Sequence, residues 1–220
     1  MSRRANTERQ ILQALEAQIL DTGMGGVGIN AIAKRAGVSK ELIYRYFDGM
    51  PGLLLTWMQE QDFWTRNPGL LVADETSQRT PGDLVLSMLR AQIDTLAGNE
   101  TLREVRRWEL IELNDVTASL AERREKAARG FIDHIDELTP DLDAPAIVGV
   151  MLAGVLYLTL RAKTASHFLG LPLREPEGWQ RIDQALAYLV ARSFPDALND
   201  QPAKDADAHP GSRASDNPDA

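Results

Sequence analysis

The side chains best suited to a chemical task in this sequence are Lys40, Tyr44 and Arg45, which bring cations and a hydroxyl group together on one short stretch. Ile43 and Phe47 are four residues apart, so on a helix both would turn towards a core and leave the polar side chains on the opposite face. An outward face of cations and hydroxyls with few bulky apolar groups suits the major groove of DNA. These residues therefore predict a DNA-reading helix.

A turn and a second helix must position that face, and the preceding residues predict both. Residues 29–36 predict a helix. Gly37 stands where the turn needs a positive φ angle, which glycine adopts without the steric penalty of a Cβ atom. Ser39 is a favourable N-cap for the third helix, which we expect over residues 40–46. The stretch is therefore predicted to be a helix-turn-helix.

The segment IAKRAGVSKELIYRYF, residues 32–47, resembles the DNA-binding domain of TetR-family transcriptional regulators, with Gly23 before it and Leu53 closing the block. The resemblance implies an all-α fold in which an N-terminal three-helix helix-turn-helix domain precedes a helical ligand-binding and dimerisation domain. It also implies a set of DNA-binding residues, which are Gly28, Asn30, Lys40, Glu41, Leu42, Tyr44, Arg45 and Tyr46.

Three residues depart from the family's pattern. Gly28 stands where serine or threonine usually caps the second helix and touches a phosphate, and Val27 replaces a frequent threonine. Met50 stands where the next helix usually opens with a lysine near a phosphate. Pro51 suits the first turn of that helix, whose free amides can still attract phosphate. We therefore expect DNA binding of modest or salt-sensitive affinity.

The glycine-rich segment GMGGVG, residues 23–28, offers an alternative, because it fits the G-x-G-x-x-G pattern of a dinucleotide-binding loop. That pattern requires a β-strand before the glycines and a second strand after the following helix. The preceding residues have a helical period, and the segment that follows is not a strand. We expect the glycines to form the turn between the first two helices; the alternative would be an NAD(P)-binding enzyme.

No arrangement for catalysis, and none for a cofactor, can be read from the sequence. There is no cysteine, and the three histidines, His134, His167 and His209, lie far apart, which argues against a metal site. No Ser-His-Asp, Cys-His or paired-carboxylate set is legible. We therefore expect a protein that is not an enzyme and that has no metal and no cofactor.

Charge and hydropathy indicate where the protein works. The net charge is −8, yet residues 1–48 carry seven basic against five acidic side chains, so a polyanion would be steered to the N-terminal end. The N-terminus lacks the apolar segment of a secretory signal. The most apolar run, residues 145–160, is shorter than the roughly 20 residues that span a bilayer. We expect a cytoplasmic protein with no membrane partner.

The sequence divides into three regions. They are a DNA-binding domain over residues 1–50, an all-helical effector-binding and dimerisation domain over 51–195, and a polar, acidic tail over 196–220 that is expected to be disordered. No strand is expected in the second region. Its helices are predicted over residues 51–66, 81–97, 100–113, 115–138, 144–168 and 178–193.

Two of these helices are candidates for a dimer interface made of two helices from each subunit, as the resemblance also implies. Helix 144–168 has apolar residues on all sides and is expected to be buried nearly all round. Helix 178–193 carries one apolar stripe. The predicted contacts are Gly149, Ala153, Ile182, Ala185, Leu186, Leu189 and Val190. The alternative is that both helices only close the core of their own subunit.

An effector pocket is expected inside the second domain, lined by large or adaptable side chains. The candidates are Trp57, Met58, Trp64, Met88, Trp108, Glu112, Met151 and Tyr157. For each apolar candidate the alternative is plain core. Glu112 and Glu109, on the same predicted helix as Trp108, could select a cationic ligand; the alternative for both is a solvated carboxylate. The basic runs around Arg106 and Arg124 alternate with glutamates and predict exposed, salt-bridged helix faces.

The predicted function is that of a ligand-responsive, sequence-specific regulator of transcription. We expect a homodimeric repressor that a small molecule releases from its operator. The expected partners are double-stranded operator DNA, an unidentified small-molecule effector and a second copy of the chain.

Overall fold

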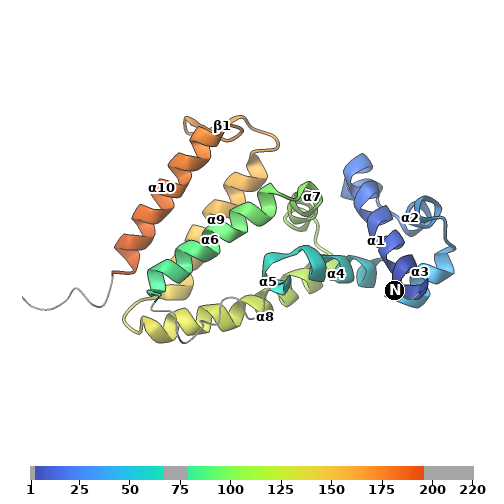
Figure 1. Cartoon of the computed structure of the whole chain (residues 1–220), viewed down its shortest axis with the longest axis horizontal. Coiled ribbons are helices and arrows are strands. Elements are labelled where there is room, and N and C mark those ends of the chain that lie inside the picture. The colour runs from blue at the N-terminus through green and yellow to red at the C-terminus, as the bar shows by residue number, and fades with distance from the viewer. Residues whose placement is uncertain (1–2, 67–78, 196–220) are drawn as a thin grey trace, which may run out of the picture.

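The computed structural model describes residues 3–66 and 79–195 (Figure 1). This part of the chain is helical apart from loops and one two-residue antiparallel strand pair, so the predicted all-α fold is confirmed. The elements in chain order are α1 Arg3–Thr22, the 3-10 turn η1 Met24–Gly26, α2 Ile29–Ala36, α3 Lys40–Phe47, α4 Gly49–Gln61, α5 Phe63–Arg66, α6 Pro81–Ala97, α7 Glu100–Glu109, α8 Asp115–Leu138, α9 Ala144–Arg161, β1 His167–Phe168, β2 Leu171–Pro172 and α10 Pro176–Ser193.

Helices α1, α2 and α3 form one unit around apolar side chains, and we call them the reader unit. α1 packs on α2, and α2 on α3. Ile11, Leu15, Ile32 and Ile43 have no exposed surface in their shared core. As predicted, Gly37 ends α2 in the left-handed conformation, at φ 65°, which lets the chain turn at once into α3.

Helix α4 follows α3 almost directly. The chain turns through Asp48 and Gly49, whose φ angles are 57° and 87°. The backbone of α4 then passes so close to the end of α3 that a Cβ atom at Gly52 would lie 1.7 Å from the carbonyl oxygen of Phe47. Only glycine allows the two helices this approach, so the reader unit is held firmly against the start of α4.

The core of the reader unit continues into the second half of the chain. Trp57 on α4 has no exposed surface, and its indole Nε1 donates a hydrogen bond to Glu16 Oε1 on α1. Leu96, Leu102 and Val105 from α6 and α7 join the same apolar cluster. The predicted domain boundary therefore falls inside a continuous core, and a movement of α4 or α7 would reach the reader unit.

A second apolar core lies among α5, α6, α8, α9 and α10, at the end of the molecule remote from the reader unit (Figure 1). Met88 and Ile135 are fully buried in it. The helices around this core begin at well-formed caps. Thr80 and Asn114 each form a capping box, and Asp143 accepts a backbone amide of α9.

The helix predicted over residues 144–168 is shorter than expected and is not buried on all sides. α9 ends at Arg161, after which the chain forms the β1–β2 pair. Val150 and Tyr157 on α9 are 75% and 51% exposed. By length and composition this helix could cross a membrane, which is weak evidence because core helices of soluble proteins meet the same test. Part of the apolar surface of α9 is therefore open in the single chain.

Two other predicted helices are interrupted. The helix expected over 51–66 breaks at Asp62, whose carboxylate accepts a backbone amide of α5. The helix expected over 100–113 ends at Glu109, and the residues after it form an exposed turn. The tail predicted to be disordered, residues 196–220, lies outside the described residues.

Candidate functional site

The outward face of α3 is the first candidate site. Ile43 and Phe47 are buried, as predicted, and Leu42 is half-buried. The exposed side chains of the helix include Lys40, Glu41, Tyr44 and Arg45. This face presents ammonium, guanidinium and hydroxyl donors with a single carboxylate, a combination that can hydrogen-bond to base edges and to phosphates.

Neither α2 nor α3 has a side-chain hydrogen bond at its N-cap, although Ser39 was expected to provide one for α3. Ser39 occupies the N-cap of α3, but its hydroxyl accepts no hydrogen bond from the first amides of the helix. The carboxylate of Glu41 bonds its own backbone amide and the Ser39 hydroxyl, which lowers the pKa of Glu41. Gly28 occupies the N-cap of α2 and, having no side chain, leaves that helix's first amides uncapped. Those amides can face a phosphate.

Tyr46 is half-buried, and it organises two cations beside the reader face. The guanidinium carbons of Arg4 and Arg45 lie 5.0 Å and 5.3 Å from the centre of its ring. Arg4 also pairs with Glu8 on α1. Stacking of this kind fixes the direction of a guanidinium group, so Arg4 is placed beside α3. The sequence prediction omitted Arg4 because nothing local links it to residues so far along the chain.

Not every cation of the N-terminal region is available to a ligand. Arg35 on α2 bonds to Asp21 and Gln18 on α1. It therefore holds α2 against α1. Asn30, also predicted to bind DNA, is exposed in the first turn of α2, beside Gly28 at its N-cap.

The glycine segment 23–28 does not form a dinucleotide-binding loop. It follows the helix α1 where the pattern requires a strand, and it contains the 3-10 turn η1. Gly23 has a φ angle of 67° and reverses the chain after α1. The NAD(P)-binding interpretation of this segment is therefore wrong, and the predicted turn is confirmed.

The residues predicted to line an effector pocket are scattered. Three of them are buried in the apolar cores: Trp57, Met58 and Met88. Two are half-buried against a core: Trp108 and Met151. Glu112 is exposed in the turn after α7. Trp64 and Tyr157 each line a groove described below.

A cleft of about 530 Å³ lies between α7, α8 and α9, and we call it the α7–α9 cleft. Its size is within the range of small-molecule sites, roughly 300–1,000 Å³. Its apolar wall consists of Leu110, Ala121, Ala153, Leu156, Tyr157 and Leu160. Its polar groups come from Arg106, Glu109, Thr117 and Arg124. An apolar wall with a few convergent polar groups is what a small-molecule site requires.

The charged side chains of this cleft belong to a network that joins α7, α8 and the α4–α5 junction. Arg124 Nη2 donates to both carboxylate oxygens of Glu109, at 2.9 and 2.8 Å, and Arg124 Nε donates to Asp62 Oδ2 at 3.1 Å. Arg106 Nη1 donates to Glu109 Oε2 at 3.3 Å. The four side chains are between 6% and 15% exposed. The predicted exposure of the two basic runs is therefore wrong for Arg106 and Arg124, which turn towards buried acids.

Burial raises the pKa of Glu109 to about 7; the charge of Arg106 opposes the shift and that of Asp62 adds to it. Glu109 is thus half-protonated near neutral pH. The sequence alone predicts either a group that selects a cationic ligand or a solvated carboxylate at this position, and not a buried one. One signal could have placed it correctly: with Leu102, Val105 and Arg106 it follows the i, i+3, i+4, i+7 spacing of the inward face of α7.

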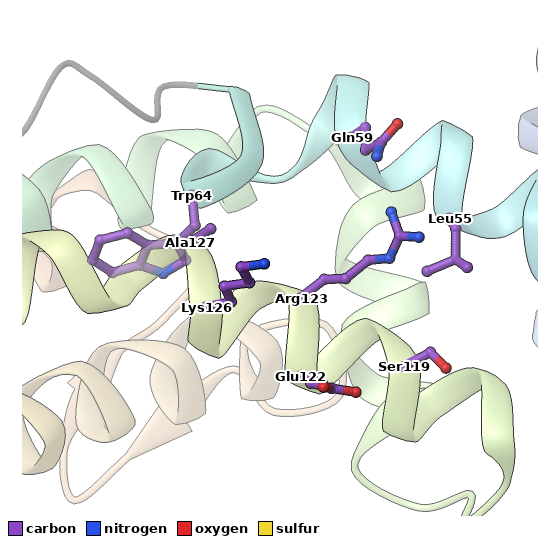
Figure 2. A pocket seen from close by; sticks show the side chains of 8 residues that line it. All are labelled: Leu55, Gln59, Trp64, Ser119, Glu122, Arg123, Lys126 and Ala127. Carbon is purple, nitrogen blue, oxygen red and sulfur yellow. The ribbon is translucent and has the colours of Figure 1, made fainter.

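A second, more open groove of about 830 Å³ lies between α4, α5 and α8 (Figure 2). Arg123 extends from α8 towards Gln59 and Leu55 on α4, and Lys126 lies on the side of Trp64. The charged side chains of this groove are exposed, and water already solvates them. It is therefore a weaker candidate for a small-molecule site than the α7–α9 cleft.

The predicted dimer contacts fall into two groups. The exposed group consists of Gly149, Ala153, Ala185 and Leu189. The buried group consists of Ile182, Leu186 and Val190, which are 4%, 7% and 3% exposed and belong to the core of their own subunit. These three therefore agree with the alternative, in which the helix closes the core of its own subunit. They form a row at i, i+4 and i+8, which is narrower than the predicted stripe of five residues. Val150 and Tyr188, which the prediction omitted, are 75% and 62% exposed.

Among residues 3–66 and 79–195, no three His, Cys, Asp or Glu side chains are grouped as metal ligands. His134 and His167 lie on different elements, α8 and β1.

Known proteins match part of this chain in sequence. The family model described as bacterial regulatory proteins, tetR family, matches residues 11–56. The HTH-type transcriptional regulator BetI 1 of Chromohalobacter salexigens is 32% identical over 94 residues, which are 43% of this chain and 46% of that protein. The match thus spans about half the length of that relative.

Solved structures share the fold of most of the chain. FadR from Bacillus subtilis, a transcriptional regulator crystallised in complex with stearoyl-CoA, is 18% identical, with a TM-score of 0.65 over 83% of this chain and 97% of its own. A TetR-like transcriptional regulator from Rhodococcus sp. RHA1 is 16% identical, with a TM-score of 0.62 over 87% and 97%. At these identities the likeness concerns the fold alone.

The reader unit, its exposed α3 face and the helical second half define a helix-turn-helix protein of the regulator class. Together with the family match over residues 11–56, they show that the chain carries a DNA-binding domain of the TetR type.

Proposed function

We propose that the protein is a cytoplasmic, homodimeric repressor that binds an operator through α2 and α3 and releases it when a small molecule binds the second half of the chain. The observation that carries the proposal is the exposed face of α3, where Tyr44 and Arg45 point outwards while Ile43 and Phe47 anchor the helix. BetI 1, which matches 43% of the chain, is named as an HTH-type transcriptional regulator. FadR in complex with stearoyl-CoA supports an effector site in a protein of this fold.

DNA binding is tested with a duplex selected by the wild-type protein from a random pool, using fluorescence anisotropy. Tyr44→Ala and Arg45→Ala should each weaken binding about tenfold or more, because a good side-chain contact to a base is worth roughly 1–3 kcal/mol. Arg129→Ala, which removes an exposed arginine from α8, is the matched control and should leave the affinity unchanged. Unchanged affinity in both α3 variants, with helicity intact by circular dichroism, would reject the assignment of α3.

Dimerisation is proposed because one short helix touches too few bases, so two half-sites about one DNA turn apart are required. The apolar side chains left open on α9 and α10, including Val150 and Leu189, support an interface there. In sedimentation velocity, Val150→Glu and Leu189→Glu should shift a wild-type dimer towards monomer. Leu20→Glu, at an exposed position on α1, should not. A wild-type monomer, or a dimer indifferent to both changes, would contradict the proposal.

Release of DNA requires that the effector bind the DNA-incompetent form more tightly than the competent one. We propose that α4 carries this coupling because it contacts both sides. Its Gly52 lies against the end of α3, and Asp62, directly after its last residue, pairs with Arg124 in the α7–α9 cleft. A ligand that rearranges the cleft would thus change the position of α4 under the reader unit.

A further inference from the structure

We propose that the α7–α9 cleft takes an amphipathic anion, whose single acidic head group is held by Arg106 and whose apolar body lies along Leu156 and Tyr157. This inference rests on the proposed function, because it gives the effector of that function a site and a chemical class. Three features of the cleft carry it: its unused hydrogen-bond donors, its apolar wall and its link to α4.

The unused hydrogen-bonding groups in the floor of the cleft are donors. Glu109 accepts from Arg124 with both oxygens and from Arg106 with one of them. Asp62 accepts from Arg124 and from the amide of Trp64. Arg106, by contrast, is 8% exposed and makes one hydrogen bond within the described part of the chain, through Nη1. Its Nε and Nη2 are left for a ligand that lies in the cleft.

An anion satisfies those donors better than a cation or a neutral group would. The planar guanidinium fork matches a carboxylate in geometry and charge. A cationic head group would compete with Arg124 for Glu109 and would be repelled by the positive charges of Arg106 and Arg124. A neutral body fits the rest of the cleft, whose wall is formed by Leu110, Ala121, Ala153, Leu156, Tyr157 and Leu160.

The position of Arg106 lets such a head group act on the rest of the protein. The charged groups that face Glu109 are Arg106 on α7, Arg124 on α8 and Asp62 at the α4–α5 junction. An anion that takes Arg106 removes one of the two cations that neutralise Glu109. The remaining cation, Arg124, then redistributes between Glu109 and Asp62. The rearrangement of the ion pairs thus extends from the ligand at Arg106 to Asp62, directly after α4.

The test is direct binding by isothermal titration calorimetry, without DNA. Three probes with the same ten-carbon body differ only in the head group: decanoate, decylamine and decanol. We expect decanoate to bind wild-type protein at least tenfold more tightly than either of the others. Arg106→Gln should lose that preference. Ala121→Phe, which fills the cleft from an exposed position on α8, should weaken decanoate binding while leaving every charge in place.

The control is Arg123→Gln, which removes a cation from the neighbouring α4–α8 groove and should bind decanoate like the wild type. Equal binding of the three probes, tighter binding of decylamine, or decanoate binding that survives Ala121→Phe would overturn the proposal. Loss of decanoate binding in Arg123→Gln alone would move the site to the other groove and overturn it as well. DNA binding by wild-type protein, measured separately, reports on the proposed function alone, so the two can fail independently.

Discussion

Trp57 on α4 donates a 2.8 Å hydrogen bond from its indole Nε1 to Glu16 Oε1 on α1, 41 positions earlier in the chain. The indole ring is completely buried, whereas Glu16 is half-buried. This bond fixes the first helix of the reader unit to the helix that leads towards the α7–α9 cleft. Besides the approach of Gly52 to Phe47, it is therefore a second direct contact between α4 and the reader unit.

Replacing Trp57 should show whether its hydrogen bond only stabilises the fold or also links α4 to DNA binding. Trp57→Phe removes the donor, retains an aromatic ring and leaves the Glu16 carboxylate without this partner, so the free energy of unfolding should fall by about 1–3 kcal/mol. The control is Trp179→Phe, because Trp179 Nε1 makes an equivalent bond to the Leu173 carbonyl. Urea denaturation should show a loss in both variants. Operator affinity should change in Trp57→Phe alone; equal affinities in the two variants would argue against coupling through this bond.

The raised pKa of Glu109 predicts a pH dependence of stability. Its pKa is about 7 in the folded protein and near 4.3 in an unfolded chain. Between these values the folded state binds the extra proton, so this group's contribution to stability falls as the pH rises. The stability of wild-type protein relative to Glu109→Gln should decrease by about 2 kcal/mol from pH 5 to pH 7. Urea denaturation at several pH values measures this difference, and a flat difference would contradict the buried, protonated carboxyl.

The helix-turn-helix could be predicted because its determinants are local. Gly37, Ile43 and Phe47 act within a few residues of one another, and the structure places each as its type and spacing indicated. The polar face of α3 follows from the same spacing. Residues predicted to lie on the same face of this helix therefore do so in the structure.

The charge network of the cleft could not be predicted in the same way. Asp62 and Arg124 are 62 positions apart, and no periodicity connects them. The exposed face of α9 was missed for a related reason: an apolar sequence shows that a helix avoids water, but does not show whether its own subunit or a second one covers it. Ile182 is buried in the core of its own subunit, whereas Val150 is exposed in the single chain.

Two glycines predict opposite responses to the same substitution. Gly52→Ala would place a Cβ atom 1.7 Å from the carbonyl oxygen of Phe47, so α3 and α4 would have to separate. The loss of stability should be several kcal/mol, on the order of other severe steric changes. Gly130→Ala, on the exposed surface of α8 with no atom within 4 Å of the added Cβ, should instead stabilise by about 0.5–1 kcal/mol. Thermal unfolding distinguishes the two, and tolerance of alanine at 52 would contradict the packing of α3 on α4.

Gly28→Ser should strengthen the reader unit at a position where this chain departs from the TetR-family pattern. Gly28 is the N-cap of α2, its backbone is extended, and no atom lies within 4 Å of an added Cβ. A serine there can adopt the same backbone and present a hydroxyl to the first amides of α2 or to a phosphate. Capping alone should add a few tenths of a kcal/mol to stability.

The larger expected effect is on DNA. One added hydrogen bond to phosphate, worth about 1 kcal/mol, corresponds to roughly fivefold tighter operator binding. The control is Gly25→Ser, in the η1 turn, where the space around the Cβ is equally open but no α-helix begins. Fluorescence anisotropy should show tighter binding for Gly28→Ser and no change for Gly25→Ser. Weaker binding by Gly28→Ser would show that the backbone of α2 approaches the DNA too closely for a side chain, and that the glycine is there to permit that approach.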